Sequence, residues 1–147
     1  MVALKKSKEK RVSVANGEFL PFGSGRFESI VCTGSLEHFD SASRGLEEMR
    51  RVLKPKGFLY LVVPNSSFWT RHFGYTGTEQ PHEINMMREE WTAALEEHGF
   101  EVESIQKDPG PPIFKNFHPA GILKRLIIRI TPFKCAYQYA FSATRTG

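Results

Sequence analysis

Residues 27–65 read FESIVCTGSLEHFDSASRGLEEMRRVLKPKGFLYLVVPN, and this stretch decides the fold. Two apolar runs, residues 30–32 and residues 58–63, flank a segment whose apolar side chains recur at helical spacing, namely Leu46, Met49, Val52 and Leu53. A strand, a helix and a strand joined by short links predict a parallel pair with a right-handed crossover. The second run is apolar almost throughout, which is typical of a strand covered on both faces.

The helix of this unit has start and stop signals. Asp40 and Ser41 are both good N-cap residues, so we expect the helix to begin beside one of them. Pro55 and Gly57 are expected to end it, and residues 54–57 then form the turn into the second strand.

Polar residues follow both predicted strands. The first strand ends at residues 33–38, TGSLEH, and the second ends at Asn65. Open α/β sheets bind ligands outside the carboxyl ends of their strands, so the sequence predicts a ligand site here. Glu37 and His38 form the best chemical pair, although the same residues also suit a polar loop that caps the following helix. Asn65 either faces a ligand or forms an Asx turn after the strand.

The flanking sequence continues the alternation of strands and helices, which predicts an α/β fold. Residues 11–15 alternate, with Val12 and Val14 inward, and predict a short strand. Residues 66–85 are aromatic and have no clean period, as in a lid or substrate loop. The later elements are a helix at 86–98 with Met87, Trp91, Ala94 and Leu95 on one face and Gly99 after it, a strand at 100–105, a short helix at 122–130 and a last strand at 135–143.

Composition is that of an ordinary single globular domain spanning residues 1–147, with 40% apolar and 24% charged residues. The net charge of +4 is too small a basic field for nucleic-acid binding. Cys32 and Cys135 lie in separate apolar runs, so we expect free thiols, no metal site and a reducing compartment. Residues 1–11 lack the apolar stretch of a signal peptide, and no run is long enough to span a membrane, which together predict a cytoplasmic chain.

Four segments of the chain resemble class I S-adenosylmethionine-dependent methyltransferases, in particular the type 11 group that includes the ubiquinone-biosynthesis methyltransferases. These are residues 16–22 (NGEFLPF), residues 27–39 (FESIVCTGSLEHF), residues 48–57 (EMRRVLKPKG) and residues 89–100 (EEWTAALEEHGF). The resemblance implies a Rossmann-like methyltransferase sheet that is mostly parallel with an antiparallel last strand. It also implies that S-adenosyl-L-methionine is the cofactor and that the partner is a small-molecule acceptor.

Carried over residue by residue, the resemblance implies a donor site. Asn16 stands where the family usually has Asp and would contact the adenine, because a carboxamide oxygen can also accept from the adenine amino group. The other donor-site residues implied are Gly17 and Glu18 at the ring nitrogens, Phe19 and Leu20 beside the ring, and Cys32, Thr33, Gly34 and Leu36 along the methionine part. His38 would lie near the sulfonium and the acceptor, either as a general base or only by position.

The acceptor side is less defined by the resemblance. Candidate substrate residues are Asn65, Trp69, Tyr75 and His82. For the two aromatic residues the alternative is a lid that packs on itself or on a partner. For His82 the alternative is a surface loop histidine.

One family feature is absent from the sequence, namely the glycine-rich loop with its acidic-x-Gly-x-Gly pattern. By the family pattern the chain is N-terminally truncated, with residues 2–10 as the end of a helix and only the third strand onward present. The missing first strand would lie beside residues 27–32 and leave an open edge that a homo-oligomer or a partner chain would cover. We therefore expect a fragment, a misplaced start or a degenerate partner subunit. Its function is methyl transfer that is incomplete in this chain alone, or a non-catalytic interaction or regulatory role.

Overall fold

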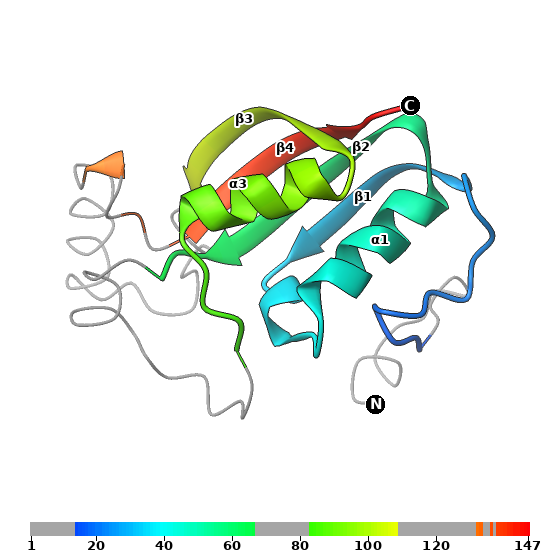
Figure 1. Ribbon diagram of the computed structural model, residues 1–147, viewed down its shortest axis with the longest axis horizontal. Coiled ribbons are helices and arrows are strands. Elements are labelled where there is room, and N and C mark those ends of the chain that lie inside the picture. The colour runs from blue at the N-terminus through cyan, green and yellow to red at the C-terminus, as the bar shows by residue number, and fades with distance from the viewer. Residues whose placement is uncertain (1–13, 67–82, 109–131, 134–135, 137) are drawn as a thin grey trace, which may run out of the picture.

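Four strands and two helices make up the part of the chain that the computed structural model describes, which is residues 14–66, 83–108, 132–133, 136 and 138–147. The strands are β1 (Phe27–Thr33), β2 (Leu53–Pro64), β3 (Phe100–Asp108) and β4 (Gln138–Arg145). The helices are α1 (Ala42–Val52) and α3 (Arg88–Glu97), and one 3-10 turn, η1 (Leu36–His38), follows β1. Both helices cover the same face of the sheet (Figure 1).

The sheet has the strand order β1-β2-β4-β3. Strands β1 and β2 are parallel, and β4 runs antiparallel to both of its neighbours, β2 and β3. Three strands therefore share one direction and β4 opposes them, which confirms the α/β fold with an antiparallel last strand. Two of the three pairings are nevertheless antiparallel, so "mostly parallel" describes the directions of the strands and not their hydrogen bonding.

Helix α1 begins where the sequence predicted. Ser41 is its N-cap, and the Ser41 hydroxyl accepts a hydrogen bond from the backbone N–H of Arg44 at 3.3 Å. The side chains of Leu46, Met49 and Val52 are buried against the sheet, as their spacing indicated. The apolar face of this helix thus fixes the crossover between β1 and β2.

Residues 54–57 are not a separate turn, and here the sequence-based expectation was wrong. Strand β2 already begins at Leu53, which pairs with Phe27, and the next paired residues are Ser29 and Phe58. One residue of β1 therefore lies opposite four residues of β2, which makes a bulge. Lys56 has a φ of 61° in the left-handed region, so the bend that Pro55 and Gly57 signalled is absorbed inside the strand.

Three further boundaries differ from expectation. Residues 11–13 of the predicted first strand lie outside the described residues, and Val14, which was expected to point inward, is 68% exposed and, like Ala15, belongs to no described strand. Met87 was expected on the buried face of a helix from residue 86, but it is the N-cap of α3 and is 49% exposed. The last strand starts and ends a few residues later than predicted, and the predicted helix at 122–130 lies outside the described residues.

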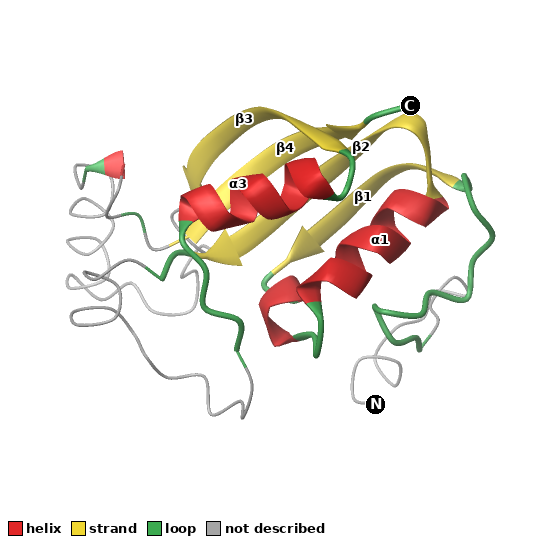
Figure 2. Cartoon of the chain, in the orientation of Figure 1, coloured by secondary structure: helices red, strands yellow, loops and turns green. Residues whose placement is uncertain are grey.

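The core lies between the helices and one face of the sheet (Figure 2). Leu59, Leu61 and Val63 of β2 are fully buried on that face, together with Trp91 and Leu95 of α3. On the opposite face, Val31 is 69% exposed and Phe58 is also exposed, so the described chain covers β2 on both faces only in part. Within the described ranges, neither helix combines the length and the apolar character that crossing a membrane requires.

Candidate functional site

The carboxyl ends of β1 and β2 lie side by side and form the floor of the candidate site (Figure 1). Thr33 pairs with Val62, and the backbone N–H of Gly34 donates to the Val62 carbonyl at 3.0 Å. The segment before α3 closes over this edge, because the Ile84 N–H donates to the Glu37 carbonyl at 2.6 Å and the Ser66 N–H donates to the Met86 carbonyl at 3.2 Å. Residues 33–38, 65–66 and 83–86 therefore meet at the end of the sheet where ligands bind in open α/β folds.

The turn at residues 16–19 is closed by its own backbone and side chain. The Phe19 N–H donates to the Asn16 carbonyl at 3.0 Å, and the Glu18 N–H donates to the Asn16 side-chain oxygen at 2.9 Å. This hydrogen bond engages the Glu18 N–H that the sequence assigned to an adenine nitrogen. Phe19 is 63% exposed, and the Arg44 guanidinium lies 5.9 Å from its ring centroid. The turn therefore presents an accessible aromatic face beside a polar edge.

The Glu18 side chain has a role that the sequence did not reveal. It is buried, and its carboxylate accepts a hydrogen bond from the backbone N–H of Ser41, the N-cap of α1, at 2.8 Å. A carboxylate at a helix N-terminus is stabilised by the orphan N–H groups and the helix dipole. Glu18 thus fastens the turn at residues 16–19 to the start of α1.

A second contact fastens the following residues to α1. The Leu20 N–H donates to the Glu48 carboxylate at 2.7 Å, while Arg51 donates to the carbonyls of Leu20 at 3.0 Å and Phe22 at 2.7 Å. Arg51 and Glu48 also pair at 2.6 Å, and this hydrogen bond from Arg51 lowers the pKa of the Glu48 carboxyl. Both side chains are partly exposed, so we assign this cluster a positioning role and only a small share of the stability.

Phe39 links the turn, η1 and α1 through two glycines. A Cβ placed on Gly17 would lie 2.1 Å from the Phe39 ring, and a Cβ on Gly45 would lie 2.6 Å from the same ring. Only glycine leaves room for the ring at both positions. The ring therefore ties the adenine turn predicted from the sequence to the segment that carries Glu37 and His38.

The loop after β1 places the predicted methionine-binding residues at the sheet edge. Gly34 has a φ of 58°, which glycine adopts without strain, and Thr33 and Gly34 are both exposed. Cys32 is buried, and burial raises the pKa of its thiol to about 11, with the charge of Glu37 adding to the effect. The thiol is therefore neutral and is not a nucleophile. The Leu36 side chain is fully buried in the core, which leaves only its backbone for a ligand.

Glu37 and His38 are adjacent on η1. The Glu37 carboxylate lies 3.9 Å from His38 Nε2, and the residue is only 3% exposed. Burial raises the pKa of the Glu37 carboxyl and the charge of Glu83 acts in the same direction, whereas the backbone N–H groups of Glu37 and Ser35 and the His38 ring oppose the rise. Glu37 Oε2 is buried with no hydrogen-bond partner. The sequence indicated this pair, but the unpartnered oxygen is visible only in the structure.

Asn65 is engaged within the protein. Its side-chain amide donates to the Ala136 carbonyl at 2.8 Å and to the Tyr139 hydroxyl at 3.2 Å, and the Tyr139 hydroxyl donates to the Phe133 carbonyl at 2.8 Å. These contacts tie the end of β2 to the entry into β4. The other predicted substrate residues, Trp69, Tyr75 and His82, lie outside the described residues.

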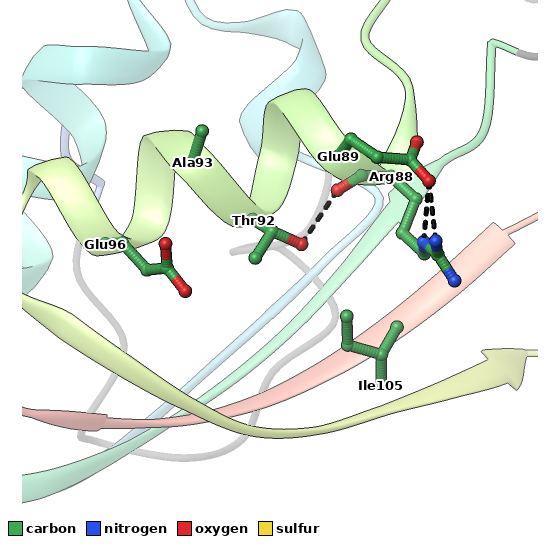
Figure 3. Close-up of a pocket in the computed structure, with 6 residues that line it drawn as sticks. All are labelled: Arg88, Glu89, Thr92, Ala93, Glu96 and Ile105. Carbon is green, nitrogen blue, oxygen red and sulfur yellow. Dashed lines mark hydrogen bonds and ion pairs between the residues drawn. The ribbon is translucent and has the colours of Figure 1, made fainter.

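A hollow of about 330 Å³ lies elsewhere, between α3 and β3 (Figure 3). It is lined by Arg88, Glu89, Thr92, Ala93, Glu96 and Ile105. Arg88 pairs with Glu89 at 2.6 Å, and the Thr92 hydroxyl donates to the Arg88 carbonyl at 2.9 Å. The hollow contains none of the site residues predicted from the sequence. Three of its polar side chains, Arg88, Glu89 and Thr92, already bind one another or the helix backbone, so we do not place the ligand there.

Comparison with known proteins shows that this chain is similar to methyltransferases. Residues 1–61 match the family described as a methyltransferase domain. The chain is 29% identical over 116 residues to malonyl-[acyl-carrier protein] O-methyltransferase of Geobacter sulfurreducens, and the match covers 71% of the chain and 43% of that protein. It is also 29% identical over 110 residues to 2-methyl-6-phytyl-1,4-hydroquinone methyltransferase 1, chloroplastic, of Oryza sativa subsp. japonica, covering 74% of the chain and 32% of that protein. The chain thus spans less than half the length of these relatives.

The fold recurs in solved structures of low sequence identity. One is the 1,6-didemethyltoxoflavin-N1-methyltransferase of Burkholderia thailandensis with bound 1,6-didemethyltoxoflavin and S-adenosylhomocysteine. The superposition has a TM-score of 0.59 at 19% identity and covers 89% of this chain and 48% of that one. At this identity the likeness establishes the shared fold.

Proposed function

We propose that this chain, whose residues 1–61 match a methyltransferase domain and whose fold recurs in a solved methyltransferase, serves in the transfer of a methyl group from S-adenosylmethionine to a small-molecule acceptor. The observation that supports this most is the meeting of two segments at one end of the sheet. The turn at residues 16–19 and the loop at residues 33–38 are held together there by Phe39.

The residues present at this edge suit the donor. An exposed aromatic ring at Phe19 and the carboxamide of Asn16 fit a purine, which needs a flat apolar face and a polar edge. Gly34 leaves open space at the end of β1, because a Cβ there would have only the Glu37 carboxylate nearby, at 3.7 Å. In the proposed arrangement Asn16 to Phe19 hold the adenine, and Cys32, Thr33, Gly34 and the Leu36 backbone lie along the methionine part.

In the proposed mechanism the protein mainly orients two reactants. S-adenosylmethionine supplies an activated methyl group when bound, so the chain contributes position and the exclusion of water. His38 lies beside Glu37 and is half-buried. Where the acceptor atom carries a proton, His38 would accept that proton while the methyl group passes from the donor sulfur to the acceptor atom.

The acceptor is proposed only at the level of a small molecule. The two relatives described above are named for a phytyl hydroquinone and for a malonyl group on acyl-carrier protein, which are chemically unlike each other. Trp69, Tyr75 and His82 remain the proposed acceptor-side residues. Asn65 would act there by holding the end of β2, since its amide hydrogens bind Ala136 and Tyr139.

The sequence has no acidic-x-Gly-x-Gly segment, and we propose that the donor affinity of these 147 residues alone is low. Saturation-transfer NMR with S-adenosylhomocysteine detects binding in the millimolar range and gives the test. Asn16→Ala and Phe19→Ala are expected to weaken the adenine signals, whereas the control Phe22→Ala, which changes another exposed ring, is expected to leave them unchanged. Equal signals in all four proteins would refute the adenine site. Micromolar affinity by calorimetry would refute the low affinity of the isolated chain.

A second candidate function is a non-catalytic interaction subunit. Among the described strands, β1 pairs only with β2, so its other edge offers unpaired backbone groups, and Val31 on β1 is largely exposed. In this alternative another chain covers that edge. Methyl transfer by a reconstituted complex, measured with labelled donor, separates the two functions, because a non-catalytic subunit would leave His38→Ala without effect on the rate.

A further inference from the structure

Glu37 has a buried carboxylate that the protein satisfies only in part. The residue is 3% exposed, and Oε2 has no hydrogen-bond partner, whereas the backbone N–H groups of Glu37 and Ser35 favour its charged form. Leaving a buried acceptor without a hydrogen bond destabilises the fold by more than one hydrogen bond usually stabilises it. This penalty is larger when the acceptor is charged. Such an atom in a native structure calls for an explanation.

The carboxylate lies beside the loop that follows β1. Its Oε1 is 3.7 Å from the Cβ position of Gly34 and 3.9 Å from His38 Nε2, and its charge acts on the Cys32 thiol. Three residues of the proposed donor and acceptor site therefore surround it. The titratable groups that act on it are His38 and Glu83, and Glu83 belongs to the segment that closes over the site.

We propose that Glu37 binds the α-ammonium group of the donor, an inference that rests on the proposed function. The missing partner must be a hydrogen-bond donor, and a positive one matches a buried carboxylate best. Of the polar groups of S-adenosylmethionine, the ammonium is the only cation that carries N–H bonds. The sulfonium has no hydrogen to donate, the donor carboxylate repels Glu37, and the adenine is assigned to the turn at residues 16–19.

The test compares Glu37→Gln with the wild-type chain, and Glu47→Gln is the control because Glu47 is an exposed glutamate on α1. The first measurement is thermal unfolding without ligand. Glu37→Gln is expected to raise Tm by a few degrees, because it removes a buried charge but keeps an acceptor for the two N–H groups. The second measurement is NMR titration with S-adenosylhomocysteine and with its deamino analogue, in which hydrogen replaces the ammonium. Glu37→Gln is expected to weaken the first ligand about tenfold or more and to leave the second unchanged.

The outcomes distinguish this inference from the proposed function. A lower Tm for Glu37→Gln would mean that the carboxylate is a structural group, and equal weakening of both ligands would mean that it does not meet the ammonium; either result overturns the inference. If the wild-type chain binds neither ligand, even at millimolar concentration, the proposed donor site is refuted. The proposal that Glu37 binds the donor ammonium is then refuted with it. The Tm comparison would in that case still decide whether Glu37 is an unsatisfied buried charge.

Discussion

Replacing Gly45 by alanine has two opposite effects on stability, because alanine favours the helix but its Cβ overpacks the core. Gly45 lies inside α1, where alanine is favoured over glycine by about 1 kcal/mol. The added Cβ, however, would lie 2.6 Å from Phe39 Cδ2 and 2.8 Å from Leu36 Cδ1. Ordinary contacts of this kind begin at 3.4 Å, so two side chains of the 33–39 segment must move by more than half an ångström.

Overpacking of this size costs about 1–3 kcal/mol. With a central cost of about 2 kcal/mol and a propensity gain of about 1 kcal/mol, Gly45→Ala should lower the free energy of unfolding by about 1 kcal/mol, and Tm by about 2–4 °C. Because Leu36 and Phe39 flank Glu37 and His38, the same change should also weaken S-adenosylhomocysteine binding.

Thermal and urea unfolding of Gly45→Ala measure the first effect. Gly23→Ala is the matched control, because a Cβ there would meet only the Arg26 side chain at 3.8 Å and it should leave Tm unchanged or slightly raised. Combining Gly45→Ala with Phe39→Leu should recover part of the loss, since the smaller side chain vacates the space that the ring fills. A higher Tm for Gly45→Ala alone would show that propensity outweighs packing and would refute this reasoning.

Three further predictions concern the candidate site. The raised pKa of Glu37 means that the folded state holds its proton more tightly than the unfolded state does, so ionisation destabilises the fold. The Tm advantage of Glu37→Gln should therefore be present at neutral pH and disappear as the pH falls through the raised pKa to below 4.5, the ordinary value; an advantage independent of pH would contradict this. In a Cys135→Ser background, Cys32, with a thiol pKa of about 11, should resist a thiol reagent at pH 8 while the chain is folded and react once it is unfolded in urea; equal rates in both states would exclude a buried neutral thiol. Asn65→Ala removes the hydrogen bonds to the Ala136 carbonyl and the Tyr139 hydroxyl and should cost about 1–3 kcal/mol in urea unfolding, whereas no loss of stability would show that these two bonds do not hold the end of β2.

The parts of the fold that sequence reasoning predicted correctly depend on local signals. Ser41 caps α1 because its hydroxyl lies three residues before the Arg44 N–H, and the spacing of Leu46, Met49 and Val52 follows from the helix period. The family motifs likewise placed the residues 33–38 loop at the end of β1. These features are determined by residues that are close together in the chain, so they can be predicted from the sequence alone.

The errors and omissions depend on contacts between distant residues. Pro55 and Gly57 do bend the chain, but pairing with β1 turns the bend into a bulge, and that pairing is not a local property. Similarly, the Glu18 carboxylate reaches the Ser41 N–H across 23 positions. Oε2 of Glu37 has no hydrogen-bond partner because no donor among the described residues reaches it in the folded chain, and a sequence motif does not contain that information.

The Phe39 ring packs against both the turn at residues 16–19 and helix α1, so both segments depend on one side chain. Residues 16–19 and η1 are distant in the sequence, yet the ring leaves room for no side chain at Gly17 or Gly45. A change at either glycine is therefore felt at both ends of the proposed donor site. Substitutions at these three positions should be non-additive.

The position of β4 has a consequence for how the chain is made. Strand β4 follows β3 in the sequence but lies between β2 and β3 in the sheet (Figure 1). In the part of the chain that the structure describes, β3 has no other strand partner. During synthesis, β3 and the edge of β2 that faces away from β1 therefore stay unpaired until residues 138–145 are available. Unpaired strand edges favour wrong pairing and aggregation, so β3 and the free edge of β2 are the segments most exposed to these errors before β4 docks.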